Sequence, residues 1–387
     1  MIEKGYDEKK ILFLIESLGG GGAEKVLSTI VKHIDTQRFD VTICVICGGG
    51  TYEEEVASRV RLFPLLKNPE VYHGVAKFWY WLKYHLIYDW LPPKWVYELF
   101  LPHGNDVEIA FVEGFATKLL SYSTNSKAKK IAWVHCDLKN QPWPIISGIY
   151  GSLEEERSAY RKYDTVVCVS KLVENVMRDC YGLSNTMTIY NPIDEKRIKQ
   201  LASMVSGWNV DASKYNIISV GRLEKVKGYD ELIPIIRNVR NEGIDVHLWI
   251  AGEGTQIEDL KGLVKEMGME DCVTFTGFMK NPYSLMSKMN LFVCSSRAEG
   301  FSLVIAEAIT LGIPVVSMNC SGPRELIRMY GIGTLCDSYD ELEQEIIKSY
   351  HTRTRQKNHV TSFDDFDGID VILQIEKLLG NESLENV

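Results

Sequence analysis

The chain has 387 residues, of which 45% are hydrophobic and 25% are charged, with a formal net charge of −9. Its length and apolar content indicate two globular domains with cores of their own and give no sign of disorder. The acidic balance argues against a nucleic-acid-binding protein, because a phosphate backbone requires a basic partner surface.

The termini and cysteines indicate the compartment. Residues 1–10 are polar and charged, and the apolar run at 11–15 is too short for the core of a signal peptide. No stretch reaches the roughly 20 apolar residues that a membrane span needs. The nine cysteines are scattered, which is typical of reduced thiols in a cytosol. We therefore expect a cytoplasmic protein, soluble or peripheral on the inner face of a membrane.

Short apolar runs alternate with helical patterns along the chain, which predicts parallel sheets covered by helices. The predicted strands lie near residues 11–15, 41–46, 107–112, 130–134, 164–169, 186–190, 216–220, 246–250, 272–275, 291–294 and 314–317. The same alternation of apolar runs and helical patterns begins again after residue 192. This predicts an α/β protein of two Rossmann-like doubly wound domains, 1–191 and 192–365, followed by a helix and tail at 366–387.

A glycine run at 19–22 follows the first predicted strand and precedes a helical stretch. The backbone of Gly21 and Gly22 can therefore approach a phosphate or a sugar closely. An NAD-binding loop is one alternative, but the second predicted strand ends in 47–50, Cys-Gly-Gly-Gly, without the acidic residue that would bind the ribose. A purely structural turn is the other.

An aromatic insert spans residues 72–101. Its tryptophans and tyrosines alternate with lysines: Trp79, Trp81, Trp90, Trp95, Tyr80, Tyr84, Tyr88, Tyr97, Lys77, Lys83 and Lys94. Such a composition favours the headgroup layer of a membrane, so this stretch could dock the first domain there. The alternative is a pair of aromatic helices packed on the sheet.

His135 follows the apolar run at 131–134, at the expected carboxyl edge of a strand. That position would direct it into a cleft between the domains, where we expect the ligand site. A lone histidine is more often structural, and Asp137 is expected to shape a turn.

The second domain carries two charged loops at predicted strand ends. In the first, 221–228, Arg222 and Lys227 can neutralise a diphosphate, the alternative being a solvated basic turn. In the second, 299–307, Glu299 and Glu307 can accept hydroxyl hydrogens, and the amides that start a helix at Ser302 can face an anion. Sugar and phosphate could share this pocket.

The triplet Asp365-Phe366-Asp367 pairs two carboxylates of the kind that can bind a metal ion. It lies in an acidic tail without a neighbouring strand end or phosphate loop. We interpret it as charge at the start of the last helix and predict no metal and no cofactor.

In this order the motifs resemble the retaining glycosyltransferases of the GT4 type, which have the two-domain GT-B fold. The resemblance covers almost the whole chain and rests on these segments: Gly21–Glu24, His135–Asp137, Asn191–Asp194, Gly221-Arg222 with Lys227-Gly228, Gly252–Gly254, Thr276–Phe278 and Glu299–Glu307. It implies that the last helix returns to the first domain.

The resemblance also implies roles for single residues. His135 would contact the donor sugar, Glu299 would lie against that sugar, and Glu307 would bind the nucleotide ribose. The loop of Phe278 would border the base. Backbone amides for the diphosphate or sugar would come from Gly300, Phe301, Ser302 and Leu303.

The implied reaction transfers a hexose or N-acetylhexosamine, with retention, from a UDP-sugar to a glycan acceptor, lipid-linked, in cell-surface polysaccharide biosynthesis. It would proceed by front-face displacement, with Arg222 and Lys227 stabilising the departing diphosphate. Two alternatives remain: a nucleotide-sugar epimerase of the same fold, and a catalytically silent subunit that binds sugar nucleotides.

Overall fold

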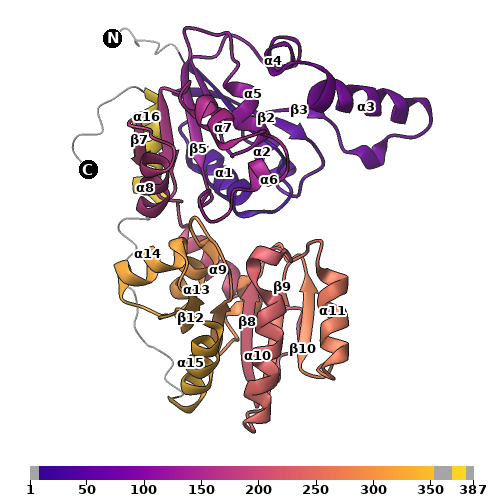
Figure 1. The fold of residues 1–387 in the computed structure, drawn as a ribbon, viewed down its shortest axis with the longest axis vertical. Coiled ribbons are helices and arrows are strands. Elements are labelled where there is room, and N and C mark those ends of the chain that lie inside the picture. Colours follow the sequence, from indigo (N-terminus) through magenta and orange to yellow (C-terminus); the bar gives the residue numbers. More distant parts are fainter. Residues whose placement is uncertain (1–7, 353–367, 381–387) are drawn as a thin grey trace. The chain divides into compact units, whose positions relative to one another are not determined.

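The computed structural model describes residues 8–352 and 368–380. The chain divides into two compact units, the first of residues 1–192 and 368–387 and the second of residues 193–367. Both are α/β units in which a sheet is covered by helices (Figure 1).

Unit 1 contains a seven-stranded sheet in the order β3-β2-β1-β4-β5-β6-β7, with every neighbouring pair parallel. The strands are β1 Lys9–Ile15, β2 Phe39–Cys47, β3 Arg61–Leu66, β4 Val107–Ala110, β5 Lys129–Val134, β6 Thr165–Cys168 and β7 Thr186–Thr188. Residues 11–15 of the central strand β1 are at most 1% exposed, because helices cover both faces of a parallel sheet.

The helices of unit 1 fill the crossovers between these strands. They are α1 Gly22–His33, α2 Glu53–Ala57, η1 Pro69–Val71, α3 Val75–His85, the π-helical turn η2 Leu86–Trp90, α4 Pro93–Phe100, α5 Phe115–Leu120, α6 Trp143–Ile146, α7 Leu153–Tyr160 and α8 Lys171–Asp179.

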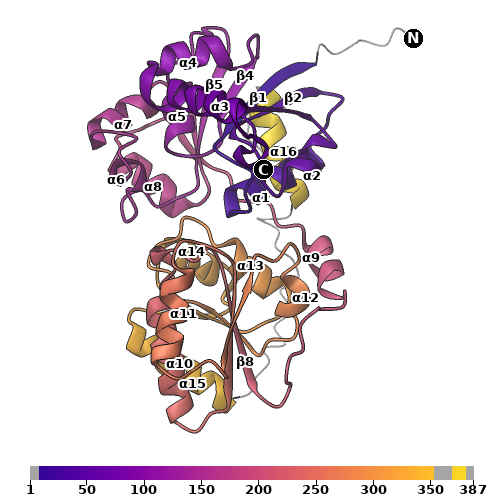
Figure 2. The same cartoon turned by 90° about the vertical axis from the view of Figure 1, so that its right-hand side faces the viewer.

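Helix α16, Gly368–Gly380, also belongs to unit 1, although the whole of unit 2 precedes it in the chain. It lies beside α1 (Figure 2). Its Glu376 accepts a hydrogen bond from the backbone N–H of Asp35 at 2.7 Å. Lys129 and Lys9 donate to the carbonyls of Leu378 and Leu379 at its C-terminal end, where the helix dipole favours cations.

Unit 2 contains a six-stranded parallel sheet in the order β10-β9-β8-β11-β12-β13. The strands are β8 Tyr215–Val220, β9 Val246–Ala251, β10 Val273–Gly277, β11 Leu291–Cys294, β12 Val315–Met318 and β13 Thr334–Cys336. The helices are α9 Glu195–Ala202, η3 Lys225–Lys227, α10 Tyr229–Asn241, α11 Ile257–Glu266, α12 Tyr283–Met286, α13 Leu303–Thr310, α14 Ser321–Tyr330 and α15 Tyr339–Thr352.

The predicted fold class is confirmed, and the strands that the sequence missed lie at sheet edges. β3 is an edge strand that includes Pro64, and β13 is an edge strand of three residues. Pro64 interrupts the apolar residues of β3, and a proline is tolerated in a sheet only at such an edge, while β13 is too short to give a clear strand signal.

Each sheet has a point where the strand order reverses, between β1 and β4 in unit 1 and between β8 and β11 in unit 2. Ligands of open α/β sheets bind outside the carboxyl ends of the strands at such a switch point. In unit 2 the two charged loops predicted from the sequence, 221–228 and 299–307, follow β8 and β11 and so flank this point.

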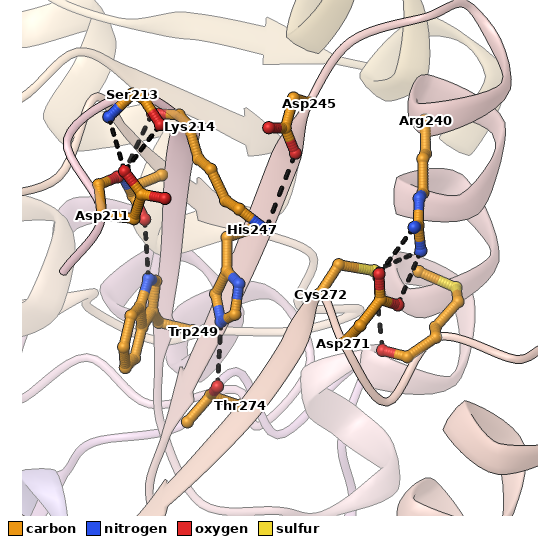
Figure 3. A network of polar contacts seen from close by, with 12 residues as sticks. Asp211, Ser213, Lys214, Arg240, Asp245, His247, Trp249, Asp271, Cys272 and Thr274 are labelled. Carbon is orange, nitrogen blue, oxygen red and sulfur yellow. Dashed lines mark hydrogen bonds and ion pairs between the residues drawn. The ribbon is translucent and has the colours of Figure 1, made fainter. Parts of the chain in front are cut away.

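The opposite, amino edge of the unit 2 sheet carries polar groups that satisfy one another (Figure 3). Arg240 pairs with both carboxylate oxygens of Asp271 at 2.8 and 2.6 Å. His247 Nε2 lies 2.9 Å from Thr274 Oγ1, and Lys214 lies 3.7 Å from Asp245. These contacts connect the starts of β8, β9 and β10 and the end of α10. A structural role therefore explains the charged side chains at this edge.

Candidate functional site

The loops that follow β8 and β11 are joined to each other. Gly228 ends η3 with φ +67°, and a Cβ at this position would collide with the carbonyl oxygen of Ser295. The hydroxyl of Ser295 donates to the Lys227 carbonyl at 2.8 Å, and the N–H of Arg297 donates to the Val226 carbonyl at 2.7 Å. Only glycine allows this approach without strain, and the approach carries Lys227 to the second loop.

Lys227 and Glu299 form an ion pair at the point where the loops meet. The Nζ of Lys227 lies 2.6 Å from Oε1 of Glu299, and the same oxygen accepts from the hydroxyl of Ser296 at 2.8 Å. The two charged side chains are 19% and 10% exposed. Burial lowers the pKa of Lys227, but the paired carboxylate outweighs it and the net pKa is raised. Lys227 is therefore a fixed cation with two further N–H donors.

Arg222 extends the positive charge of this corner. Its side chain is exposed, and it lies near enough to Lys227 for its charge to lower the pKa of that lysine. A guanidinium and an ammonium on the same loop could together neutralise a group with two phosphates. The solvated-turn alternative does not account for Lys227, which is paired and mostly buried.

Helix α13 places the second predicted carboxylate. Glu307 is 2% exposed, and its Oε1 accepts from the hydroxyl of Tyr283 at 3.1 Å. At the start of the helix, the Oγ of Ser302 is buried and makes no hydrogen bond. A buried hydroxyl without a partner costs free energy unless a ligand or water satisfies it, so this position is prepared for a polar group.

The loops after β9 and β10 continue the same edge. Glu253 accepts from the N–H of Phe278 at 3.2 Å, and the Phe278 side chain is 37% exposed. The N–H of Leu223 donates to the Glu253 carbonyl at 2.8 Å, which links this pair to the loop of Arg222. The structure thus brings together, on one unit, Arg222, Lys227, Phe278, Glu299, Gly300, Phe301, Ser302, Leu303 and Glu307.

His135, Gly21 and Gly22 form a separate group on unit 1. His135 follows β5, and its ring packs against Phe111 and Trp133 at centroid distances of 5.0 and 6.5 Å. Both ring nitrogens are buried without a hydrogen-bond partner. Burial lowers the pKa of His135 to about 3. The imidazole is neutral and can exchange hydrogen bonds with a ligand's hydroxyl group.

Glu113 supports the His135 loop and was missed by the sequence analysis. Its side chain is buried, and its Oε1 accepts from the backbone N–H groups of His135 and Cys136. Burial raises the pKa of Glu113 while these backbone bonds oppose the rise. A signal was present in the sequence, because Glu113-Gly114-Phe115 after β4 repeats the tripeptide Glu299-Gly300-Phe301 after β11.

Gly21 is the residue before α1, and its position is close to a carboxylate. A Cβ there would collide with the carboxylate of Glu24 in the first turn of the helix. A negative charge at this place favours a group with hydroxyls over a phosphate. The glycine run alone allowed either a phosphate or a sugar. With Glu24 beside it, the turn is better suited to a sugar.

Asp137 has the turn role expected for it. Its Oδ1 accepts from the N–H groups of Lys139 and Asn140 at 3.2 Å. Asp365 and Asp367, which we interpreted as helix-start charge, lie outside the described residues. Within residues 8–352 and 368–380, no group of three or more His, Cys, Asp or Glu side chains could hold a metal ion.

The fold is that of solved glycosyltransferases. Anabaena Alr3699/HepE, solved with UDP and glucose, aligns with a TM-score of 0.74 at 20% identity, covering 96% of this chain and 100% of that one. The lipopolysaccharide outer core galactosyltransferase WaaB aligns with a TM-score of 0.65 at 17% identity, covering 96% and 99%. These likenesses assign the fold to the GT-B class of glycosyltransferases.

Sequence comparison identifies the family. Residues 20–197 match the model "Glycosyltransferase Family 4", and residues 205–361 match "Glycosyl transferases group 1". An uncharacterized glycosyltransferase of Haemophilus influenzae is 26% identical over 331 residues, 85% of this chain and 86% of that protein. The chain belongs to the GT4-type glycosyltransferases.

A further relative comes from Campylobacter jejuni. It is the N-acetylgalactosamine-N,N'-diacetylbacillosaminyl-diphospho-undecaprenol 4-alpha-N-acetylgalactosaminyltransferase, 28% identical over 342 residues, which cover 86% of this chain and 87% of that protein. The resemblance stated from the motifs is thus confirmed, and the protein is a glycosyltransferase of the GT-B type.

Proposed function

We propose that this protein transfers a hexose or N-acetylhexosamine, with retention of configuration, from a UDP-sugar to a lipid-linked glycan in cell-surface polysaccharide biosynthesis. The observation that carries the proposal is the Lys227–Glu299 pair at the switch point of unit 2, with Arg222 beside it. It sets two cations and a carboxylate where a nucleotide diphosphate and its sugar would meet.

Each charged group has a task in this reaction. Arg222 and Lys227 stabilise the negative charge that develops on the diphosphate as the bond to the sugar breaks. Glu299, held by Lys227 and Ser296, is oriented to accept hydrogen bonds from the sugar hydroxyls. Glu307 receives the ribose hydroxyls, and the departing diphosphate takes the proton of the acceptor hydroxyl as the new bond forms on the same face.

The relatives support the donor and the acceptor. The HepE structure holds UDP and glucose, and the Campylobacter enzyme is named for a diphospho-undecaprenol acceptor. Names that refer to lipopolysaccharide core and O-antigen biosynthesis recur among relatives at 26 to 30% identity over part of this chain. The Campylobacter name thus supports the lipid-linked acceptor, and the lipopolysaccharide and O-antigen names support the setting in cell-surface polysaccharide biosynthesis.

A thermal-shift panel tests the donor assignment. The purified protein is heated with UDP, GDP and ADP and with their sugars, without added metal, because a ligand that binds the native state raises its apparent stability. We expect UDP and one UDP-sugar to raise the melting temperature. If none of these ligands does so, the donor site is wrongly assigned.

A transfer assay tests the catalytic assignment. With the donor identified, we expect Glu299→Ala to lower turnover by about 10²-fold or more, the scale for losing one group that acts on the transition state. Glu258→Ala is the matched control, since Glu258 on α11 is 81% exposed. Unchanged turnover in Glu299→Ala would refute the role of Glu299.

A further inference from the structure

An arm of unit 1 exposes large aromatic side chains to solvent. We call residues 75–100, comprising α3, η2 and α4, the aromatic arm. Helix α3 buries none of its residues, and Phe78, Trp79 and Trp81 are 55%, 62% and 47% exposed. Figure 1 shows α3 extending away from the sheet of its own unit. The alternative of an aromatic helix pair packed on the sheet is therefore wrong for α3.

The arm is fixed to unit 1 by buried hydrogen bonds. The hydroxyl of Tyr97 on α4 donates to Oε1 of Glu108 on β4 at 2.7 Å, and both residues are fully buried. The hydroxyl of Tyr88 on η2 donates to Glu16, directly after β1. These contacts hold η2 and α4 on unit 1, and α3, which carries three of the exposed rings, continues directly into η2.

The exposed rings are contiguous. Phe78 and Trp81 stack at a centroid distance of 6.1 Å, and Trp81 meets Trp90 edge to face at 5.7 Å. Trp79 touches Phe78 at 5.9 Å. Together, Phe78, Trp79, Trp81 and Trp90 form the aromatic face of the arm, a contiguous exposed apolar patch of the kind that marks an interaction site.

The charge of the arm is opposite in sign to that of the chain. Helix α3 contains Lys77, Lys83 and His85 and no carboxylate, and α4 adds the exposed Lys94, although the chain carries −9. The two acids of the arm are engaged: Asp89 pairs with His85 at 2.5 Å, and Glu98 accepts a hydrogen bond from Thr124. With three lysines against two carboxylates, the arm carries a net positive charge.

We propose that the aromatic face docks in the headgroup layer of an anionic lipid bilayer. Trp and Tyr with Lys are typical of the membrane–water interface, and lysines near the surface are attracted by anionic lipids. An 11-residue helix is about 16 Å long, against an apolar core of about 30 Å. No helix in the described part of the chain is long and apolar enough to span a membrane. The arm therefore lies in the interface.

This inference is independent of the donor site. Combined with the lipid-linked acceptor proposed above, it places the headgroup layer next to unit 1, which also carries His135. Vesicle binding is measured without any nucleotide, so the failure of one proposal can be distinguished from the failure of the other.

The test uses the full chain and two kinds of vesicle, phosphatidylcholine alone and phosphatidylcholine with phosphatidylglycerol. We expect co-sedimentation with the anionic vesicles and weaker binding at about 1 M salt, where the Debye length is only about 3 Å. The double variant Phe78→Ser/Trp79→Ser should lower the partition coefficient about tenfold or more, since it removes apolar area from the interface. Lys77→Glu/Lys94→Glu should abolish the preference for anionic lipid.

The control is Ile146→Ser, which removes a side chain that is 78% exposed but lies outside the arm; it should bind vesicles like the unchanged protein. Thermal unfolding checks that each variant is folded. Absence of vesicle binding, or equal binding by Phe78→Ser/Trp79→Ser, overturns the proposal. So does light scattering that shows an oligomer which the same double variant converts to monomers, because the aromatic face would then be covered by a second copy.

Discussion

The Nζ of Lys227 lies 2.6 Å from Oε1 of Glu299, although 72 residues separate them in the chain. Lys227→Ala would leave this carboxylate mostly buried and without its cation, so we expect a loss of about 2–3 kcal/mol in unfolding free energy. In Lys227→Ala/Glu299→Ala, part of that loss should be recovered, because no unpaired charge remains. Urea unfolding measures both.

A transfer assay distinguishes a catalytic role of Lys227 and Glu299 from a purely structural one. The double variant should stay inactive in the transfer assay even though its stability is partly restored, since both groups face the donor in the proposed mechanism. Transfer at the unchanged rate by the double variant would mean that the pair only holds the two loops together.

His135 should make the protein sensitive to acid. Its pKa is 6.5 when exposed and about 3 in the folded protein, so between these values the unfolded chain binds a proton that the folded chain does not. Stability should therefore fall as the pH drops from 6.5 towards 3, by up to about 1.4 kcal/mol per pH unit. His135→Phe keeps an aromatic ring beside Phe111 and should lack this part of the slope in urea unfolding. An identical slope in both proteins would contradict the neutral, buried imidazole.

Glu156 on α7 should lower the stability of the protein as the pH rises, which is opposite to the effect of His135. It is 0% exposed, its Oε2 accepts from the hydroxyl of Tyr181 at 2.8 Å, and burial raises its pKa from 4.5 to about 7. The folded protein thus holds a proton that the unfolded chain releases between pH 4.5 and 7, and this contribution to stability is lost as the pH rises. Glu156→Gln should be more stable than the unchanged protein above pH 7, by about 3 kcal/mol at most. Equal stability there would show that the carboxylate is ionised at little cost.

Gly228→Ala and Gly312→Ala form a matched pair of variants. Both glycines have nearly the same backbone angle, φ +67° and +68°, but a Cβ at Gly312 meets nothing within 4 Å while one at Gly228 would collide with the Ser295 carbonyl. Gly312→Ala should cost only the backbone strain, about 1–2 kcal/mol.

We expect Gly228→Ala to cost clearly more and to abolish stabilisation by UDP, because the loop of Lys227 must move away from the loop of Glu299. Thermal shift with and without UDP measures both effects. Equal losses in the two variants, with UDP binding intact, would show that the contact between the loops is not required.

The sequence predicted the central strands and both charged loops because each signal is local. A strand that is buried on both faces is a continuous apolar run, and the loop after it is read directly from the chain, as for 291–294 and Glu299. Of the edge strands that were missed, β3 has its apolar residues interrupted by Pro64, and β13 has only three residues. The pairing of Lys227 with Glu299 could not be predicted, since it depends on how closely two loops approach, which is set by Gly228 and Ser295.

The aromatic arm shows a different limit. Its composition suited a buried helix pair and a membrane surface equally well, because both environments select large apolar side chains. The decision depends on exposure, and Trp79 at 62% exposure is a property of the folded unit. Glu113 was missed because its partners are the backbone N–H groups of His135 and Cys136, although its tripeptide Glu-Gly-Phe repeats the one that begins at Glu299.

Helix α16 gives the chain an order of assembly. The ribosome delivers all of unit 2 before residues 368–380, yet unit 1 needs Glu376 for the N–H of Asp35 and the C-terminal carbonyls of α16 for Lys9 and Lys129. Domains fold as units during synthesis. Unit 2 can therefore complete its core before α16 has been synthesised and has packed on unit 1. We therefore expect unit 1, most of which is synthesised first, to complete its fold after unit 2.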